Sequence, residues 1–181
     1  MEGNTLLLHH RWHVIYTRSR HDKVVQQELL KKGIEFLAPT IRLCRQWSDR
    51  KKWIDVPMFP SYIFVHPQLR QMEEVLMTPG AVKYIMFNGR KAVVQDHEIE
   101  FLRLAQREET QIEVVPQTFC KEQQVVIASG TFQGLKGRLL RSYTDGRIAV
   151  SIEEIGYSII LKSDVRHTIV SPAYQSEDVL V

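Results

Sequence analysis

The stretch Phe59-Pro60-Ser61-Tyr62-Ile63-Phe64-Val65 places a proline-marked corner directly before an aromatic strand. A second stretch, Gly130-Thr131-Phe132-Gln133-Gly134-Leu135-Lys136-Gly137, sets three glycines around one aromatic residue. This spacing suits a tight turn in a small barrel, because glycine adopts backbone angles that other residues avoid. The two stretches predict two modules: a sheet with an aromatic corner, then a small all-β unit.

The composition is that of an ordinary soluble globular protein, with 44% hydrophobic and 25% charged residues in a chain of 181. This length accommodates one domain or two small ones. The formal net charge of +3 permits contact with nucleic acid without demanding it. Leu6-Leu7-Leu8 is too short for a signal-peptide core or a membrane span, and Cys44 and Cys120 suggest neither a zinc pair nor a disulfide framework. We therefore expect a reduced, cytoplasmic protein that does not contact a membrane.

Hydrophobic periodicity predicts an α+β domain over residues 11–109. The segment from Trp12 to Thr17 alternates between two faces, which is typical of a half-buried strand. A helix is expected over residues 22–32, with an apolar stripe formed by Val24, Val25, Leu29 and Leu30. The remaining expected elements are strands at 34–43, 56–65, 82–87 and 91–94, helices at 69–77 and 96–109, and a turn at Asn88-Gly89. This order implies helices packed against an antiparallel sheet.

The second module is predicted to be all-β. Residues 110–118 are polar, contain Pro116 and lack a helical stripe, which indicates a linker. Beyond it, five short strands are expected around Val126, around Leu139, and at 148–152, 159–161 and 165–169, with a hairpin turn at Asp145-Gly146. Five strands in about fifty residues favour an SH3-like β-barrel. The predicted organisation is a domain at 11–109, a linker at 110–118, a barrel at 119–170 and a tail at 171–181.

A basic hairpin is predicted from Arg42 to Trp53, which carries five basic residues against only Asp49. Such charges can lie along phosphates without sequence preference, and the alternative is a loop that its charge keeps soluble. Trp47 and Trp53 favour the first interpretation, because large aromatic side chains beside a basic tip are costly to leave in water.

The sequence predicts neither catalysis nor a metal or other cofactor. It contains no nucleophile elbow, phosphate loop, metal triad or nucleotide fingerprint. Asp96-His97-Glu98 lies at a helix start, where such residues serve as caps. His9, His10 and His13 have no acidic or cysteine partner nearby in the sequence and are interpreted as a solvated cluster. We therefore expect a protein that is not an enzyme.

The aromatic corner and the glycine turn together resemble the NusG family of bacterial transcription elongation factors, which have an N-terminal polymerase-binding domain and a C-terminal KOW module. The resemblance covers Trp12 to Val170, with Val126 and the glycine turn at the KOW spacing. It implies a NusG-type α/β sandwich followed by a KOW barrel. The segment Arg45 to Lys52 is similar to that of the specialised paralogs called UpxY antiterminators, which are relatives of RfaH. Strand-favouring runs at 148–152 and 157–161 predict a barrel rather than the helical hairpin known in RfaH-like proteins.

The resemblance also implies binding residues. In NusG-like proteins the aromatic of the first strand and the Phe-Pro corner form a groove for the polymerase clamp helices. In RfaH-like paralogs the start of the first helix meets the non-template DNA strand, although only Arg18 has a clear counterpart here. The His-Thr-Thr element of RfaH is absent, so contacts to the opposing polymerase subunit are assigned by position. With the hairpin included, the predicted site residues are Tyr16, Phe59, Pro60 and Tyr62 for the clamp helices; Glu73, Glu74 and Thr78 for the opposing subunit; Arg18, Arg20, Lys23, Arg45, Arg50, Lys51 and Lys52 for nucleic acid; and Gly130, Phe132, Gly134 and Gly137 for the KOW turn.

The implied function is transcription elongation and antitermination. The factor would bridge the polymerase cleft and suppress pausing and termination on a long operon, such as one for capsular polysaccharide. The implied partners are the catalytic subunits of RNA polymerase, non-template DNA or nascent RNA, and Rho or a small-subunit ribosomal protein. Two alternatives stay open: a housekeeping NusG that acts genome-wide with Rho, and a ribosome-associated or RNA-binding KOW protein.

Overall fold

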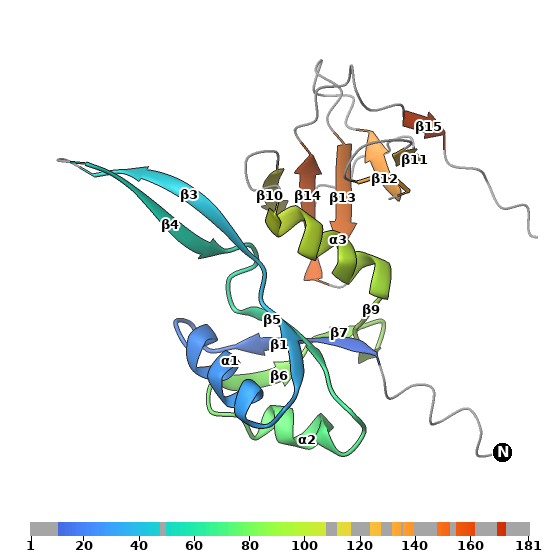
Figure 1. Cartoon of the computed structure of the whole chain (residues 1–181). Coiled ribbons are helices and arrows are strands. Elements are labelled where there is room, and N and C mark those ends of the chain that lie inside the picture. The colour runs from blue at the N-terminus through green and yellow to red at the C-terminus, as the bar shows by residue number, and fades with distance from the viewer. Residues whose placement is uncertain are drawn as a thin grey trace, which may run out of the picture. The chain divides into compact units, whose positions relative to one another are not determined.

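The computed structural model describes residues 11–47, 50–107, 112–116, 124–127, 132–134, 136–139, 148–152, 155–161 and 170–172. The chain divides into two compact units, residues 1–109 and residues 110–181, and each is described by itself. Figure 1 shows the elements of both units. None of the helices in these described ranges has the length and apolar character that crossing a membrane requires.

Unit 1 is an antiparallel sheet with helices, as the sequence predicts (Figure 1). The strand order is β2-β5-β1-β6, and β9 also pairs with β1. The chain forms two further, separate two-stranded ribbons, β3–β4 and β7–β8. The elements are β1 (Trp12–Thr17), α1 (Asp22–Lys31), β2 (Glu35–Leu37), β3 (Thr40–Gln46), β4 (Lys51–Pro57), β5 (Tyr62–His66), α2 (Gln71–Leu76), β6 (Ala81–Tyr84), β7 (Met86–Phe87), β8 (Arg90–Lys91), β9 (Val93–Val94) and α3 (Asp96–Arg107).

The core of unit 1 lies between the sheet and the two helices α1 and α2. Ile15 of β1 and Ile63 of β5 are opposite each other in the register, and both are fully buried. Val25 and Leu29 of α1 and Val75 of α2 pack in the same cluster. The predicted stripe on α1 is therefore half right, because its other two members, Val24 and Leu30, are exposed.

Strand β1 is buried on both faces, so the prediction of a half-buried strand is wrong. Every residue of β1 except Tyr16 is buried. The reason is its position: β1 is an inner strand paired with β5 on one side and with β6 and β9 on the other. One face meets the α1–α2 core, and on the other face Arg103 of α3 lies over the Trp12 ring, 5.6 Å from its centroid.

Pro39 and Pro60 mark where the chain leaves and re-enters the main sheet. The strand predicted at 34–43 is divided into β2 and β3 at Ala38-Pro39, and the one predicted at 56–65 is divided into β4 and β5. Proline has no backbone N–H to give to a ladder, so it sits at such breaks. The Met58 N–H donates to the Pro39 carbonyl over 2.8 Å, which ties the two breaks together at the base of the β3–β4 hairpin.

Unit 2 contains a six-stranded antiparallel sheet in the order β10-β14-β13-β12-β11-β15. Its strands are β10 (Ile112–Pro116), β11 (Gln124–Ile127), β12 (Lys136–Leu139), β13 (Ile148–Ile152), β14 (Tyr157–Leu161) and β15 (Val170–Pro172). The runs predicted to be strand rather than helix, β13 and β14, are confirmed as strands. The turn predicted at Asp145-Gly146 and the strand predicted at 165–169 lie outside the described residues.

The segment predicted as a linker is largely a strand. Ile112 to Pro116 form β10 and pair with β14 in full register, from Ile112 opposite Leu161 to Pro116 opposite Tyr157. The physical reason is β-branching, because Ile112, Val114 and Val115 suit a pleated surface. Pro116 is the last residue of the strand, where a missing N–H costs least.

His13 is buried in the sheet and is not part of a solvated cluster; His9 and His10 lie outside the described residues. Its Nδ1–H donates to the Ala92 carbonyl over 2.8 Å. Its ring packs edge-on against Tyr84, with centroids 5.8 Å apart. Burial lowers the pKa of His13 below its usual value, and the nearby Lys91 charge adds to this. The side chain is therefore neutral in the fold at neutral pH.

We expect the free energy of unfolding of unit 1 to fall as the pH drops below about 6.5, because the unfolded chain then takes up a proton that folded His13 excludes. His13→Asn keeps an N–H donor for Ala92 but cannot titrate. Its melting temperature should therefore fall less than that of the parent between about pH 7.5 and about pH 5.5. His97→Asn, at an exposed histidine of α3, is the matched control and should keep the parent's acid sensitivity. Equal acid sensitivity in His13→Asn and the parent would assign the effect to other groups.

Candidate functional site

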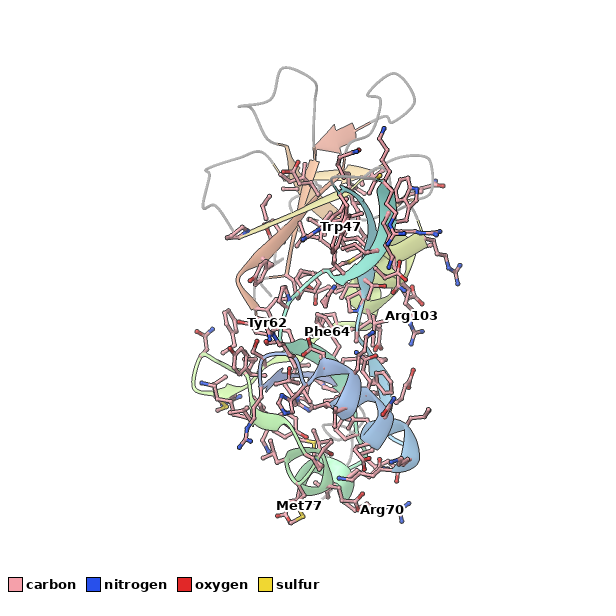
Figure 2. All side chains as sticks on the ribbon, turned by 90° about the vertical axis from the view of Figure 1, so that its left-hand side faces the viewer. Trp47, Tyr62, Phe64, Arg70, Met77 and Arg103 are labelled. Carbon is pink, nitrogen blue, oxygen red and sulfur yellow. The ribbon has the colours of Figure 1, made fainter. Side chains whose placement is uncertain are left out.

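An aromatic edge lies where β1 ends and β5 begins, formed by Tyr16, Pro60 and Tyr62. The two tyrosines are opposite each other in the register, and their rings meet edge to face with centroids 5.6 Å apart. Tyr16 is 36% exposed, Tyr62 is half-buried and Pro60 is exposed. Figure 2 shows Tyr62 beside Phe64 at this edge.

The backbone holds the corner of the aromatic edge in a fixed shape. Ser61 has a φ of 67°, in a region that residues other than glycine adopt infrequently. The Ser61 carbonyl accepts the Thr17 N–H over 2.9 Å, and the Tyr62 N–H donates to the Phe59 carbonyl over 3.1 Å. The aromatic edge is therefore set by the fold of the corner, which reduces the ordering cost of binding.

Phe59 lies beneath this edge and not on it. Its side chain is 1% exposed, and its ring meets that of Phe64 edge to face at 5.9 Å. Phe64 pairs with Val14 of β1 and is also fully buried. The sequence predicts Phe59 as a contact residue, whereas its side chain is buried beneath the corner that carries Pro60 and Tyr62.

A polar and aromatic cluster lies on the sheet face that carries Tyr16 and Tyr62, at the other end of β1 and β5. The Trp12 ring stacks on His66, with centroids 4.9 Å apart. The Glu35 carboxylate binds both His66 at 3.1 Å and Arg103 of α3 at 3.0 Å. This cluster fastens α3 to the sheet. Tyr16 and Tyr62 lie at the other end of this face, where both rings are partly in solvent.

A basic loop follows the aromatic edge directly. Arg18, Arg20 and Lys23 are all exposed. The Arg18 N–H donates to the Gly80 carbonyl over 2.8 Å, and Arg20 has a φ of 64°. The Thr17 hydroxyl donates to the Asp22 carboxylate, which fixes the turn into α1. Three cations therefore lie within a few residues of Tyr16.

The predicted basic hairpin is confirmed as the β3–β4 ribbon, which extends away from the main sheet (Figure 1). Seven residue pairs join its strands, from Thr40 opposite Pro57 to Gln46 opposite Lys51. The Trp47 N–H donates to the Arg50 carbonyl over 2.8 Å and closes the tip, whose residues 48 and 49 lie outside the described residues. The four predicted cations are exposed: Arg45, Arg50, Lys51 and Lys52.

The stretch predicted to meet the opposing polymerase subunit is only partly at the surface. Glu73 and Glu74 are exposed, but Thr78 is 2% exposed. The Thr78 hydroxyl donates to the Glu74 carbonyl over 3.0 Å and accepts from Lys32 over 2.8 Å, so it holds the end of α2 in place. Sequence reasoning did not select Met77, which is 73% exposed. Figure 2 shows Met77 and Arg70 at the end of unit 1 far from Trp47.

The glycine-rich turn of unit 2 lies between β11 and β12. Phe132 is buried, and Gly134 has a φ of +85° while its N–H donates to the Ile127 carbonyl over 2.7 Å. Gly137 lies in β12 opposite Val125. Gly130 is outside the described residues. The described part of this stretch is a turn around a buried aromatic residue, as its sequence predicts.

Comparison with known proteins gives the family. The family model for NusG, described as a transcription termination factor, matches residues 10–103, just over half of the chain. Among solved structures, the chain is similar to Thermotoga maritima NusG, with 19% identity over 90% of this chain and 97% of that chain and a TM-score of 0.47. It is also similar to a chain of the MjSpt4:Spt5 complex in conformation B, with 15% identity over 89% of this chain and 97% of that chain and a TM-score of 0.30. Because the family model spans more than half of the sequence, the chain belongs to the NusG family of transcription factors.

Proposed function

We propose that this chain is a transcription elongation and antitermination factor that binds RNA polymerase through its aromatic edge. The observation that carries the proposal is the pair of Tyr16, which is exposed, and Tyr62, which is half-buried, on a preformed corner. Exposed, rigid aromatic side chains are typical binding anchors, and an amphipathic helix laid on an apolar surface is a common recognition mode. The clamp helices of the largest polymerase subunit are the proposed partner.

The two ends of unit 1 support a bridge across the polymerase cleft. The aromatic edge lies at the end near the hairpin, and Glu73, Glu74 and Met77 lie near the α2 end (Figure 2). We assign the α2 end to the polymerase subunit that faces the clamp. A bridge that binds the closed clamp better than the open one shifts the population toward the closed state. The polymerase would then pause less and give a terminator less time to act.

The basic groups suit nucleic acid in the elongation complex. Arg18, Arg20 and Lys23 lie next to the aromatic edge, so a polymerase bound there would bring them toward the transcription bubble. The cations of the β3–β4 hairpin add a second contact to phosphates. Such contacts raise affinity without sequence preference and weaken with salt.

The specialised role is part of the same proposal. The basic segment from Arg45 to Lys52 is similar to that of UpxY and RfaH-like paralogs, which supports action on one long operon such as a capsular polysaccharide operon. Unit 2, with its turn around Phe132 and Gly134, is proposed to be a KOW barrel that tethers Rho or a small-subunit ribosomal protein. Polymerase-associated chromatin sequencing in the native host separates the specialised role from the housekeeping one. Occupancy at one locus supports the specialised role, and genome-wide occupancy supports a housekeeping NusG.

The double variant Tyr16→Ala, Tyr62→Ala tests polymerase binding. Truncating an aromatic anchor costs about 2 kcal/mol, so affinity for purified RNA polymerase should fall by a factor of roughly thirty or more. The fold should persist because both side chains are partly in solvent. Affinity is measured by pull-down titration, and folding by a circular-dichroism melt.

Leu30→Ala is the matched control, since Leu30 is an exposed apolar residue on α1, away from the aromatic edge. It should bind like the parent. Full binding by the folded double variant would refute the aromatic edge as the polymerase site. Tight RNA binding by a parent that does not bind polymerase would favour the ribosome-associated alternative.

A further inference from the structure

Two of the three tryptophans of this chain lie on the β3–β4 hairpin and are largely in water. Trp47 is 58% exposed and Trp53 is 55% exposed, whereas Trp12 is 4% exposed. Exposed indole rings forfeit the burial that normally makes tryptophan favourable in a fold. The exposure of both rings on one projecting ribbon indicates a ligand that offers flat apolar surfaces.

The same ribbon carries the net charge of the chain. Residues 40–57 contain five basic and two acidic residues, which leaves the segment at +3, equal to the formal net charge of the whole sequence. The remainder of the chain is therefore neutral overall. Such a concentration of positive charge fits a polyanionic ligand.

Cations lie beside both indole rings of the ribbon. Residues opposite each other in an antiparallel ladder share a face, so Trp53 and Lys51 lie on one face together with Arg42. The Arg42 guanidinium lies over the Trp53 ring, 5.9 Å from its centroid. Trp47 is joined to Arg50 at the tip by a backbone hydrogen bond. Each tryptophan therefore has a cation as a direct neighbour.

We propose that the β3–β4 hairpin binds an unpaired nucleic-acid strand, with bases stacked on Trp47 and Trp53 and phosphates on the neighbouring arginines and lysines. Stacking on aromatic side chains combined with a basic track is how sequence-tolerant single-strand binding works. A duplex keeps its base faces inside the stack, so it would use the cations and leave both indole rings in water. A protein partner fits less well, because lysine is depleted in protein interfaces and Lys51 and Lys52 flank the tip. The inference rests on the proposed function and names the ligand class of its hairpin.

The experiment uses the full chain and three labelled probes: an oligothymidylate of about 12 nucleotides, a uridylate of the same length, and a DNA duplex of that length, a size within the range of known single-strand binding folds. The parent should bind the unpaired probes more tightly than the duplex, with quenching of tryptophan fluorescence. Trp47→Leu, Trp53→Leu should bind oligothymidylate at least about tenfold more weakly, because stacking is lost at two positions. The affinity of this variant should depend on salt concentration as that of the parent does, since its phosphate contacts remain.

Two further variants separate stacking from charge. The triple variant Arg50→Ala, Lys51→Ala, Lys52→Ala should bind all three probes more weakly than the parent. For the unpaired probes, the plot of log affinity against log salt concentration should become shallower by about 0.7 for each phosphate contact that is lost. Leu43→Ala removes an exposed apolar side chain from the same ribbon and should bind like the parent. A tighter complex with the uridylate would point to nascent RNA, and a tighter complex with the thymidylate to displaced DNA.

Unchanged oligothymidylate affinity in the tryptophan double variant would overturn the inference, as would a parent that prefers the duplex or binds no probe. The tryptophan variant should still bind purified polymerase, because the aromatic edge is intact. If the parent binds the oligonucleotides but does not bind polymerase, the proposed function is refuted and the hairpin assignment still holds.

Discussion

Phe59→Ala is expected to destabilise unit 1 by about 3–5 kcal/mol, the usual cost of truncating a buried phenylalanine. The Phe59 ring is almost fully buried and packs edge-on against Phe64, so its removal leaves a cavity under the corner that carries Tyr62. The urea unfolding curve followed by tryptophan fluorescence measures the loss, since Trp12 is buried in the same unit. Phe59→Leu, which keeps most of the side-chain volume, should lose clearly less stability than Phe59→Ala.

This prediction separates two roles for Phe59. If it is a support, Phe59→Ala loses stability first, and polymerase binding falls only as the folded fraction falls. If it is a contact, as the sequence resemblance implies, Phe59→Ala keeps the parent's stability and loses polymerase affinity. The second outcome would mean that the corner opens to expose Phe59 when polymerase binds.

Gly80→Ala is expected to cost about 2–4 kcal/mol, because it combines a left-handed backbone conformation with a steric clash. Gly80 has a φ of +94°, and an added Cβ would lie 2.9 Å from the Cβ of His21 and 3.0 Å from Cγ2 of Val25. Neither atom is the free end of a flexible side chain, so α1 must shift. A thermal melt of the variant measures the loss.

Gly89→Ala is the matched control. Gly89 has a φ of +75°, but its added Cβ would meet nothing within 4 Å, so only the backbone cost of about 1–2 kcal/mol applies. The difference between the two variants reports the clash with α1. Equal losses would show that α1 moves aside at no cost. The Gly80 carbonyl also accepts the Arg18 N–H, so Gly80→Ala should disturb the basic loop beside Tyr16.

The elements that sequence predicted well are those whose signals are local. The basic hairpin follows from charge and strand propensity, and the turn around Phe132 from the glycine spacing. Both depend on residues close together in the chain. The α+β character of unit 1 follows from the order of helical and alternating segments, which is also a local pattern.

The failures depend on contacts between distant segments. β1 was predicted to be half-buried, but Arg103 of α3 covers Trp12 on its second face, and nothing near Trp12 in the sequence signals this. β10 was predicted to be part of a linker, because its strand character becomes clear only when Ile112 to Pro116 meet β14.

The candidate site shows the same division. The sequence selected Tyr16 and Tyr62, which the register places opposite each other at the surface. It also selected Phe59 and Thr78, which the structure buries, because residue type alone does not separate a contact from the support beneath it. Met77 went unselected, since an exposed methionine at a helix end has no sequence pattern of its own.

The length of the β3–β4 ribbon has an electrostatic consequence. Seven residue pairs at about 3.4 Å per residue place the tip roughly 20 Å from the base. The Debye length at physiological ionic strength is about 8 Å, so counterions screen the tip from charges on the rest of unit 1. The charge of the tip therefore acts independently of the charges on the rest of unit 1. Charge changes elsewhere on the surface can alter solubility or the polymerase contact without changing how fast the tip captures a polyanion.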